Sequence, residues 1–289
     1  MARFSTIADA GDVRLQPYTG LTDADHRRRL EGATGTFVVE GVTAIRRAAT
    51  SPYQLRSILV TPAKAEALAP TIEALDVDVL VADADTMAAV AGFDIHRGAV
   101  AVAARRPPAP LAALLAQRGT LAVLEGVNDH ENLGALARSA AALGVDGLVL
   151  DPTCADPLYR RCVRVSMGEI LHLPFTRAGS WPAALDTIGA EGFAVVALTP
   201  QGDDDIATVA ARCSDQPVAL LLGAEGPGLS DAALAAADDR ARIPMRPGVD
   251  SLNVGHAAAI ALYELYQTPS RTTAATTRKP STAAPARPQ

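Results

Sequence analysis

An apolar run, Pro217-Val-Ala-Leu-Leu-Leu222, constrains the fold of this chain more than any other feature. A strand with one solvated face alternates apolar and polar residues, whereas a strand covered on both faces shows a continuous apolar run. Shorter runs of the same kind recur along the chain, separated by segments with helical periodicity. This alternation predicts an α/β fold in which helices cover a parallel sheet.

The first part of the chain predicts a small α/β domain of about a hundred residues. Successive prolines then favour extended chain between Arg105 and Pro110, because proline removes a backbone donor. We assign 1–106 to an N-terminal extension plus this domain, and 107–117 to a proline-rich linker. The predicted elements are a turn at 17–20, a helix capped by Thr22 or Asp23, strands 36–40, 55–60, 77–81 and 99–103, and helices 42–49, 64–75 and 86–91.

A second domain is predicted over 118–267, where the alternation resumes. Its expected strands are 121–124, 147–150, 172–175, 194–198, 218–222 and 242–244, and its expected helices are 133–143, 157–166, 181–188, 231–236 and 254–266. Residues 268–289 consist mainly of Thr, Ala, Pro and basic residues without apolar periodicity. We predict that this tail is disordered.

Charge and composition give no sign of a nucleic-acid ligand by themselves. The formal net charge is −6, and residues 107–267 hold 10 basic against 19 acidic residues. Aromatic residues make up only 4% of the chain, so platforms for stacking bases are few. Nucleic-acid binding would therefore need local basic clusters, each of which also has a plain explanation as a solvated helix face. The candidates are His26–Arg29, Arg46–Arg47, Arg105–Arg106, and Arg160–Arg161 with Arg164.

Several classes of protein are disfavoured. No apolar stretch is long enough to span a membrane, and the first ten residues do not resemble a secretion signal. The three cysteines have no Cys-x-x-Cys spacing, which argues against disulfides and zinc and fits the cytoplasm. We expect no metal site, and interpret Asp203–Asp205 as a solvated acidic loop.

Three segments carry the functional signal. In Leu124–Ser139, Asn132 occupies a helix-cap position before an apolar stripe, and Arg138 is a discordant cation on that helix. Both can face the crevice at the end of the preceding strand. Gly223-Ala-Glu-Gly-Pro-Gly228 lets a ligand approach the backbone, yet differs from the dinucleotide fingerprint G-x-G-x-x-G. Ile243–Leu265 predicts a strand, a loop containing Ser251 and Asn253, and a helix whose first amides can bind a polar ligand.

In this order and at these distances, the three segments resemble the signature motifs of the SpoU-type, TrmH-like branch of the SPOUT RNA 2′-O-ribose methyltransferases. The resemblance implies S-adenosylmethionine as cofactor, a deep trefoil knot in 118–267 and a homodimer formed through the knotted domain, with helix 254–266 in the interface. Residues 34–104, with 37–47 and His96–Val100, resemble the ribosomal-protein-L30e-like substrate-binding domain. This favours ribosomal RNA, 23S in particular, as substrate.

The resemblance also implies roles for individual residues. Arg138 would assist deprotonation of the ribose hydroxyl, by orientation and charge more readily than as a base, because a guanidinium pKa lies above ~12. The implied catalytic residues are Asn132, Arg138, Glu225, Ser251 and Asn253. The implied cofactor contacts are Leu222, Gly223, Gly226, Ile243, Met245 and Leu252.

Three alternatives remain open from the sequence. One is a transfer-RNA substrate for the same reaction. Another is an RNA-binding assembly factor that keeps the fold without turnover, against which the presence of Arg138 and Asn253 speaks. The third is a nucleotide-dependent oxidoreductase, which the missing glycine fingerprint disfavours.

Overall fold

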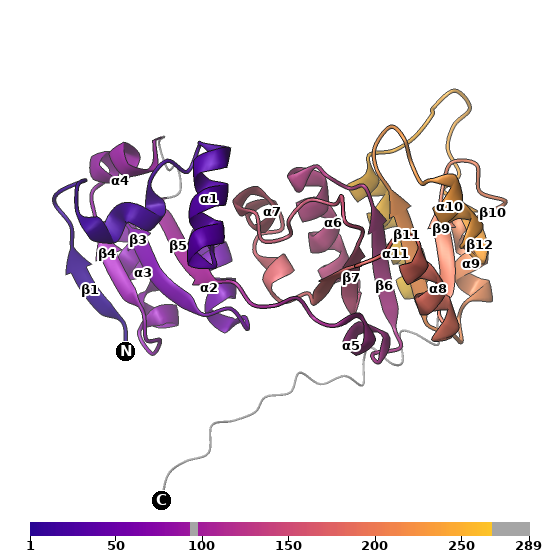
Figure 1. Cartoon of the computed structure of the whole chain (residues 1–289), viewed down its shortest axis with the longest axis horizontal. Helices are drawn as coiled ribbons and strands as arrows, with labels where there is room; N and C mark the ends of the chain where they lie inside the picture. The colour runs from indigo at the N-terminus through magenta and orange to yellow at the C-terminus, as the bar shows by residue number, and fades with distance from the viewer. Residues whose placement is uncertain (93–97, 268–289) are drawn as a thin grey trace, which may run out of the picture.

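The structure of the chain, a computed structural model, describes residues 1–92 and 98–267. Within them, two β-sheets follow one another along the chain, the first on the left of Figure 1 and the second on the right. The predicted disordered tail 268–289 lies outside the described residues, as do His96 and Arg97 of the L30e-like segment. None of the helices in the described ranges is long and apolar enough to cross a membrane.

The first sheet has the strand order β1-β4-β3-β5-β2. Neighbours are parallel from β1 to β3, whereas β5 runs antiparallel to both β3 and β2. Its strands are β1 (Arg3–Thr6), β2 (Thr36–Glu40), β3 (Leu55–Val60), β4 (Asp78–Val81) and β5 (Ala99–Ala104). Its helices are the 3₁₀ helix η1 (Val13–Tyr18), α1 (Ala24–Thr34), α2 (Val42–Thr50), α3 (Pro62–Ile72) and α4 (Ala84–Ala91).

The second sheet is parallel throughout, with the order β10-β12-β9-β11-β6-β7-β8. This confirms the predicted α/β fold with a parallel sheet. Its strands are β6 (Thr120–Glu125), β7 (Gly147–Leu150), β8 (Phe175–Arg177), β9 (Ala194–Leu198), β10 (Asp204–Asp205), β11 (Val218–Gly223) and β12 (Asp239–Arg242). Its helices are α5 (Leu111–Leu115), α6 (His130–Ala142), α7 (Arg160–Val165), the 3₁₀ helix η2 (Glu169–Leu171), α8 (Ala183–Ala190), α9 (Ile206–Arg212), α10 (Asp231–Ala235) and α11 (Val254–Gln267).

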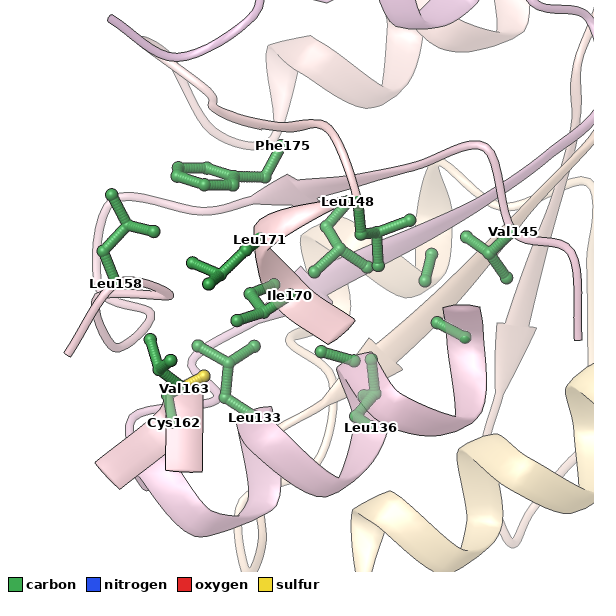
Figure 2. Close-up of a cluster of buried hydrophobic side chains, with 14 of the residues drawn as sticks. Leu133, Leu136, Val145, Leu148, Leu158, Cys162, Val163, Ile170, Leu171 and Phe175 are labelled. Carbon is green, nitrogen blue, oxygen red and sulfur yellow. The ribbon is translucent and has the colours of Figure 1, made fainter. Parts of the chain in front are cut away.

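The apolar run in β11 is covered on both faces, as predicted. Ala219 and Leu221 belong to a hydrophobic cluster with α5, α8 and α10, whereas Leu220 and Leu222 belong to a larger cluster with α6, α9 and α11. Figure 2 shows part of the larger cluster, where Leu133 and Leu136 of α6 point toward Ile170 and Leu171 of η2. The larger cluster also includes residues of the first sheet, so one hydrophobic core extends through both halves.

Several predicted boundaries were wrong. The strand predicted at 172–175 begins only at Phe175, since Pro174 cannot donate to a ladder, and residues 172–174 form a turn that follows η2. The strand predicted at 242–244 is instead Asp239–Arg242, whose single buried residue is Ala241. Asp203–Asp205 is no simple solvated loop either, because β10 pairs with β12 and Asp205 binds Arg242 at 2.9 Å. The short elements β1, α5, β10 and α9 were not predicted.

Ion pairs join the two halves of the chain. Glu40, at the end of β2, is 5% exposed and accepts from Arg160 Nη1 at 2.5 Å, with Arg164 Nη1 at 3.7 Å. Arg105 Nη2 lies 2.7 Å from a carboxylate oxygen of Asp156 and 3.2 Å from one of Glu31. Because these arginines extend between α1, β2 and α7, the junction is built from charges as well as from apolar contact.

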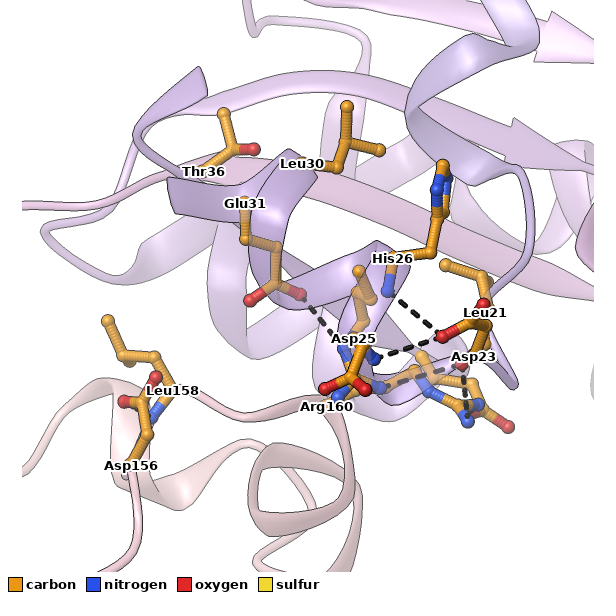
Figure 3. A network of polar contacts seen from close by, with 12 residues as sticks. Leu21, Asp23, Asp25, His26, Leu30, Glu31, Thr36, Asp156, Leu158 and Arg160 are labelled. Atoms are coloured by element: carbon orange, nitrogen blue, oxygen red, sulfur yellow. Dashed lines mark hydrogen bonds and ion pairs between the residues drawn. The ribbon is translucent and has the colours of Figure 1, made fainter. Parts of the chain in front are cut away.

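Many residues of the predicted basic clusters therefore contact carboxylates, carbonyl groups or a ring within the chain. Asp23 caps α1, as expected, and Arg160 reaches from the other half of the chain to this region, where it donates to the carbonyl of Leu21 at 3.4 Å (Figure 3). Arg27 is buried over the ring of Tyr159, with its guanidinium carbon 3.9 Å from the ring centroid. Arg47 pairs with Glu169 at 2.5 Å. Arg27, Arg47 and Arg160 are thus engaged within the chain. The side chains of Arg28 and Arg161 stay 78% and 55% exposed, and RNA contact by such members stays a prediction.

Glu40→Gln is expected to lower the free energy of unfolding by about 3 kcal/mol, since it removes a buried charge and leaves the partly buried Arg160 without its counter-charge. Urea denaturation measures this loss. The matched control is Asp25→Asn, which breaks the exposed Arg28–Asp25 pair of 3.2 Å and should cost less than ~1 kcal/mol. Equal losses in the two variants would contradict a structural role for the Glu40 network.

Candidate functional site

A cavity of about 650 Å³ lies at the carboxyl ends of β9 and β11, the edge where parallel α/β sheets bind ligands. Three loops form its wall: 198–201 after β9, 222–229 after β11, and the segment from Ile243 to Ala257. The structure brings nine of the eleven predicted site residues together here: Leu222, Gly223, Glu225, Gly226, Ile243, Met245, Ser251, Leu252 and Asn253. The loop 198–201 was missed, although its Thr-Pro-Gln-Gly turn directly follows a predicted strand.

The glycine loop is tightly folded. Gly228 N donates to the carbonyl of Ala224 at 3.0 Å, and these two residues form an antiparallel bridge. A Cβ on Gly223 would lie 2.3 Å from the carbonyl carbon of Gly228, a distance that real side chains do not adopt. The loop therefore closes on itself and presents backbone groups to the cavity.

Asn253 joins the three sequence motifs. Its Nδ2 donates to Asn132 Oδ1 at 2.7 Å and to Glu225 Oε1 at 2.6 Å. Its Oδ1 accepts from the amides of Gly255 at 3.0 Å and His256 at 3.3 Å, which caps the start of α11. The nitrogen and the oxygen of the Asn253 side-chain amide are thus both hydrogen-bonded. The residues that Asn253 joins lie at the rim of the cavity.

Asn132 is not the helix cap that the sequence suggested. The carboxylate of Asp129 caps α6 by accepting from the amides of Glu131 and Asn132, both at 2.8 Å. The side chain of Asn132 is therefore free to accept from Asn253. The preceding sequence Asn128-Asp-His-Glu contains a carboxylate suited to capping three residues before Asn132, and this Asp129 takes the role.

Arg138 is not brought to the cavity. The residue is exposed on α6 and does not line the cavity. Its side chain has no ion pair or hydrogen bond to any other described residue. Six residues correspond to more than one and a half helical turns, so Arg138 and Asn132 face different directions. Close approaches of Gly255 to Ala135 and of Gly144 to Tyr266 show that α6 and α11 run parallel, which puts Arg138 near the level of Ile260.

The charge of the lining favours a cationic ligand. Glu225 and Asp250 are its carboxylates, and the described lining residues include no lysine or arginine. Leu222, Ile243 and Leu252 supply apolar surface, which suits a flat ring. Within residues 1–92 and 98–267, no group of three His, Cys, Asp or Glu side chains could hold a metal ion.

Gly223→Ala is expected to lower the free energy of unfolding by about 2 kcal/mol, because the added methyl group forces the glycine loop apart. Gly189→Ala in α8 is the matched control, since nothing lies within 4 Å of its added Cβ. Alanine there should be neutral or slightly stabilising. Urea denaturation compares the two, and a neutral Gly223→Ala would contradict the tight loop.

Comparison with known proteins identifies the family. The SpoU rRNA Methylase family matches residues 119–263. An uncharacterized tRNA/rRNA methyltransferase of Mycobacterium tuberculosis is 44% identical over 89% of this chain and 90% of its own length. A Bacillus subtilis 23S rRNA guanosine-2′-O-methyltransferase is 29% identical over 83% of this chain and 92% of its own length.

A solved structure has the same fold over almost the whole length. The AdoMet-bound rRNA methyltransferase of Sinorhizobium meliloti superimposes with a TM-score of 0.76, covering 91% of this chain and 97% of its own, at 26% identity. The match of sequence, fold and motif positions shows that this chain belongs to the SpoU rRNA methylase family and is an RNA methyltransferase with an α/β fold of the SPOUT type.

Proposed function

We propose that this protein transfers a methyl group from S-adenosylmethionine to a ribose 2′-hydroxyl of ribosomal RNA. The observation that supports this most is the contact of Asn253 with Asn132 and Glu225, because it gathers three distant motifs at the rim of one cavity. The names of the Bacillus subtilis and Sinorhizobium meliloti proteins support the 2′-O position, the cofactor and the substrate class.

The residues of the cavity fit this cofactor. S-adenosylmethionine supplies a methyl group on a positively charged sulfur. The carboxylates of Glu225 and Asp250 would attract this positive charge. Leu222, Ile243 and Leu252 would cover the adenine with apolar surface. Gly223 and Gly226 would offer backbone groups, and Met245 further apolar contact. The volume of about 650 Å³ lies in the range of small-molecule sites.

The rim residues would bind and orient the ribose. Ser251 lies beside Leu252, so its hydroxyl can hold the ribose hydroxyl in line with the methyl group. Asn253, whose side-chain amide is already bonded at both ends, would hold this loop in position. Asn132 and Glu225 fix the amide of Asn253 through their hydrogen bonds. These roles are positional, and orientation accounts for much of the rate when the methyl donor is already reactive.

Arg138 would act on RNA from the neighbouring protomer of a homodimer. The predicted interface on helix 254–266 relied on its apolar residues Ala257, Ala258, Ala261, Leu262 and Leu265. All of these except Ala257 are buried within the chain itself, so that part of the prediction was wrong. On the outer face of α11, Ile260 is instead 40% exposed and Tyr263 is 51% exposed. Along the helix axis, these residues lie near the same height as Arg138 of α6. A two-fold contact through this face would carry Arg138 toward the partner's cavity. There it would pair with a phosphate bidentately.

Ribosomal RNA is favoured over transfer RNA by the first sheet of the chain, which the sequence resemblance links to ribosomal substrates. An RNA substrate and three buried free cysteines also fit the predicted cytoplasmic location.

Calorimetric titration of S-adenosylmethionine is expected to give roughly micromolar binding, weakened at least about tenfold by Leu252→Arg, because the arginine puts bulk and positive charge into the cavity. Val249→Arg is the matched control, since Val249 lies on the same loop, is 50% exposed and does not line the cavity. It should bind like the unmodified chain. Equal effects of the two arginines, or no binding to the unmodified chain, would contradict the proposed pocket.

Mixing two inactive variants tests the dimer and the position of Arg138 together. Arg138→Ala loses the phosphate contact and Leu252→Arg loses the cofactor. A mixed dimer would hold one complete site if Arg138 serves the partner's cavity, so coexpression should recover about a quarter of the unmodified activity. Incorporation of labelled methyl groups into ribosomal RNA measures this. The control mixes Arg138→Ala with the double variant Arg138→Ala/Leu252→Arg, which supplies no intact Arg138 and should recover nothing. No recovery in either mixture would contradict the shared site.

A further inference from the structure

Glu125 is a buried carboxylate beside the cavity that the proposed mechanism does not use. It ends β6, is 9% exposed, and pairs in register with Gly223, the first residue of the glycine loop. It does not line the cavity. Burying a carboxylate costs free energy unless hydrogen bonds satisfy it, so its partners indicate what it holds in place.

Three donors converge on Glu125. The amide of Ser230 donates to Oε2 at 2.8 Å, and the Ser230 hydroxyl donates to Oε1 at 2.7 Å. The indole Nε1 of Trp181 donates to Oε1 at 2.6 Å. The Ser230 hydroxyl also accepts from the amide of Ala233 at 3.2 Å and so caps α10. One carboxylate thus ties together the end of β6, the start of α10 and the segment before α8.

This cluster stands directly behind the wall of the cavity. Leu229, directly before Ser230, and Leu234, one turn after it in α10, both line the cavity. Leu229, Leu234 and Trp181 pack against the same hydrophobic cluster. Any displacement of Ser230 therefore moves the end of the glycine loop and two wall residues at once.

We propose that Glu125 is a positioning residue of the cofactor pocket, which holds the glycine loop in its binding shape through Ser230, and that Trp181 senses the state of this loop. The inference rests on the proposed cofactor function and gives a role to Glu125, a residue of the first motif segment to which the sequence assigned none. Trp181 is the single tryptophan of the chain, so its fluorescence can be assigned without ambiguity.

Glu125→Gln tests the inference with little change in shape. A glutamine has one acceptor oxygen, and its NH₂ group would face either the Ser230 amide or the Trp181 indole, both of which are donors. The expected result is a roughly tenfold rise in the Kd of S-adenosylhomocysteine by calorimetry, since a buried donor loses its partner. In the unmodified chain the ligand should shift Trp181 emission with the same Kd. In Glu125→Gln the free protein should already emit differently, and the ligand-induced shift should shrink.

Asp146→Asn provides the matched control at the opposite end of β6. Asp146 Oδ2 accepts from the amide of Thr120 at 2.9 Å, far along the strand from the cavity. This variant is expected to keep the Kd and the emission shift of the unmodified chain, whatever thermal stability it loses. If Glu125→Gln binds within twofold of the unmodified chain, or if Asp146→Asn weakens binding equally, the inference is overturned while the pocket stands. Failure of the unmodified chain to bind overturns both.

Discussion

The pairing of β11 between β6 and β9, with apolar cover on both faces, is the constraint on which the rest of the structure depends. Because all neighbours run parallel, the loops that follow these strands emerge at one edge of the sheet. The strand ends at Gly223, where the chain must turn back closely on itself. The position of the cavity is thus a direct result of where an apolar strand stops.

Polar contacts at this edge add what the sheet alone cannot supply. Strand ends determine where loops begin, but they do not determine the relative positions of side chains that come from different loops. Asn253 does this for the rim through its two donor contacts, and Glu125 does it behind the wall through three acceptor contacts. Each residue has one partner more than a hundred positions away, Asn132 for Asn253 and Ser230 for Glu125, so the order of the site depends on complete folding of the sheet.

The sequence was most informative where local chemistry determines structure. The apolar strands, the cap at Asp23 and the glycine loop follow from nearest-neighbour rules, and these elements appear as predicted. Predictions that needed three-dimensional partners were weaker. Ile243 was placed in the strand 242–244, yet β12 ends at Arg242; the residue lines the cavity, as only the family resemblance indicated. The arginines of α1 and α7 look like a nucleic-acid surface until Glu40 and Glu31 are seen opposite them. Arg138 shows the same limit, since helical spacing gives its direction but not its neighbours. The trefoil knot stays a prediction of the family resemblance.

The charged junction between the two sheets has a consequence for how such chains can diversify. Glu40 faces two arginines from the other half of the chain, and both halves contribute to one hydrophobic core. A foreign recognition domain grafted at the proline-rich segment would lack Glu40 and leave those partly buried arginines without their counter-charge. New RNA targets would therefore be gained more readily by changing exposed residues of the existing first sheet than by exchanging it as a module.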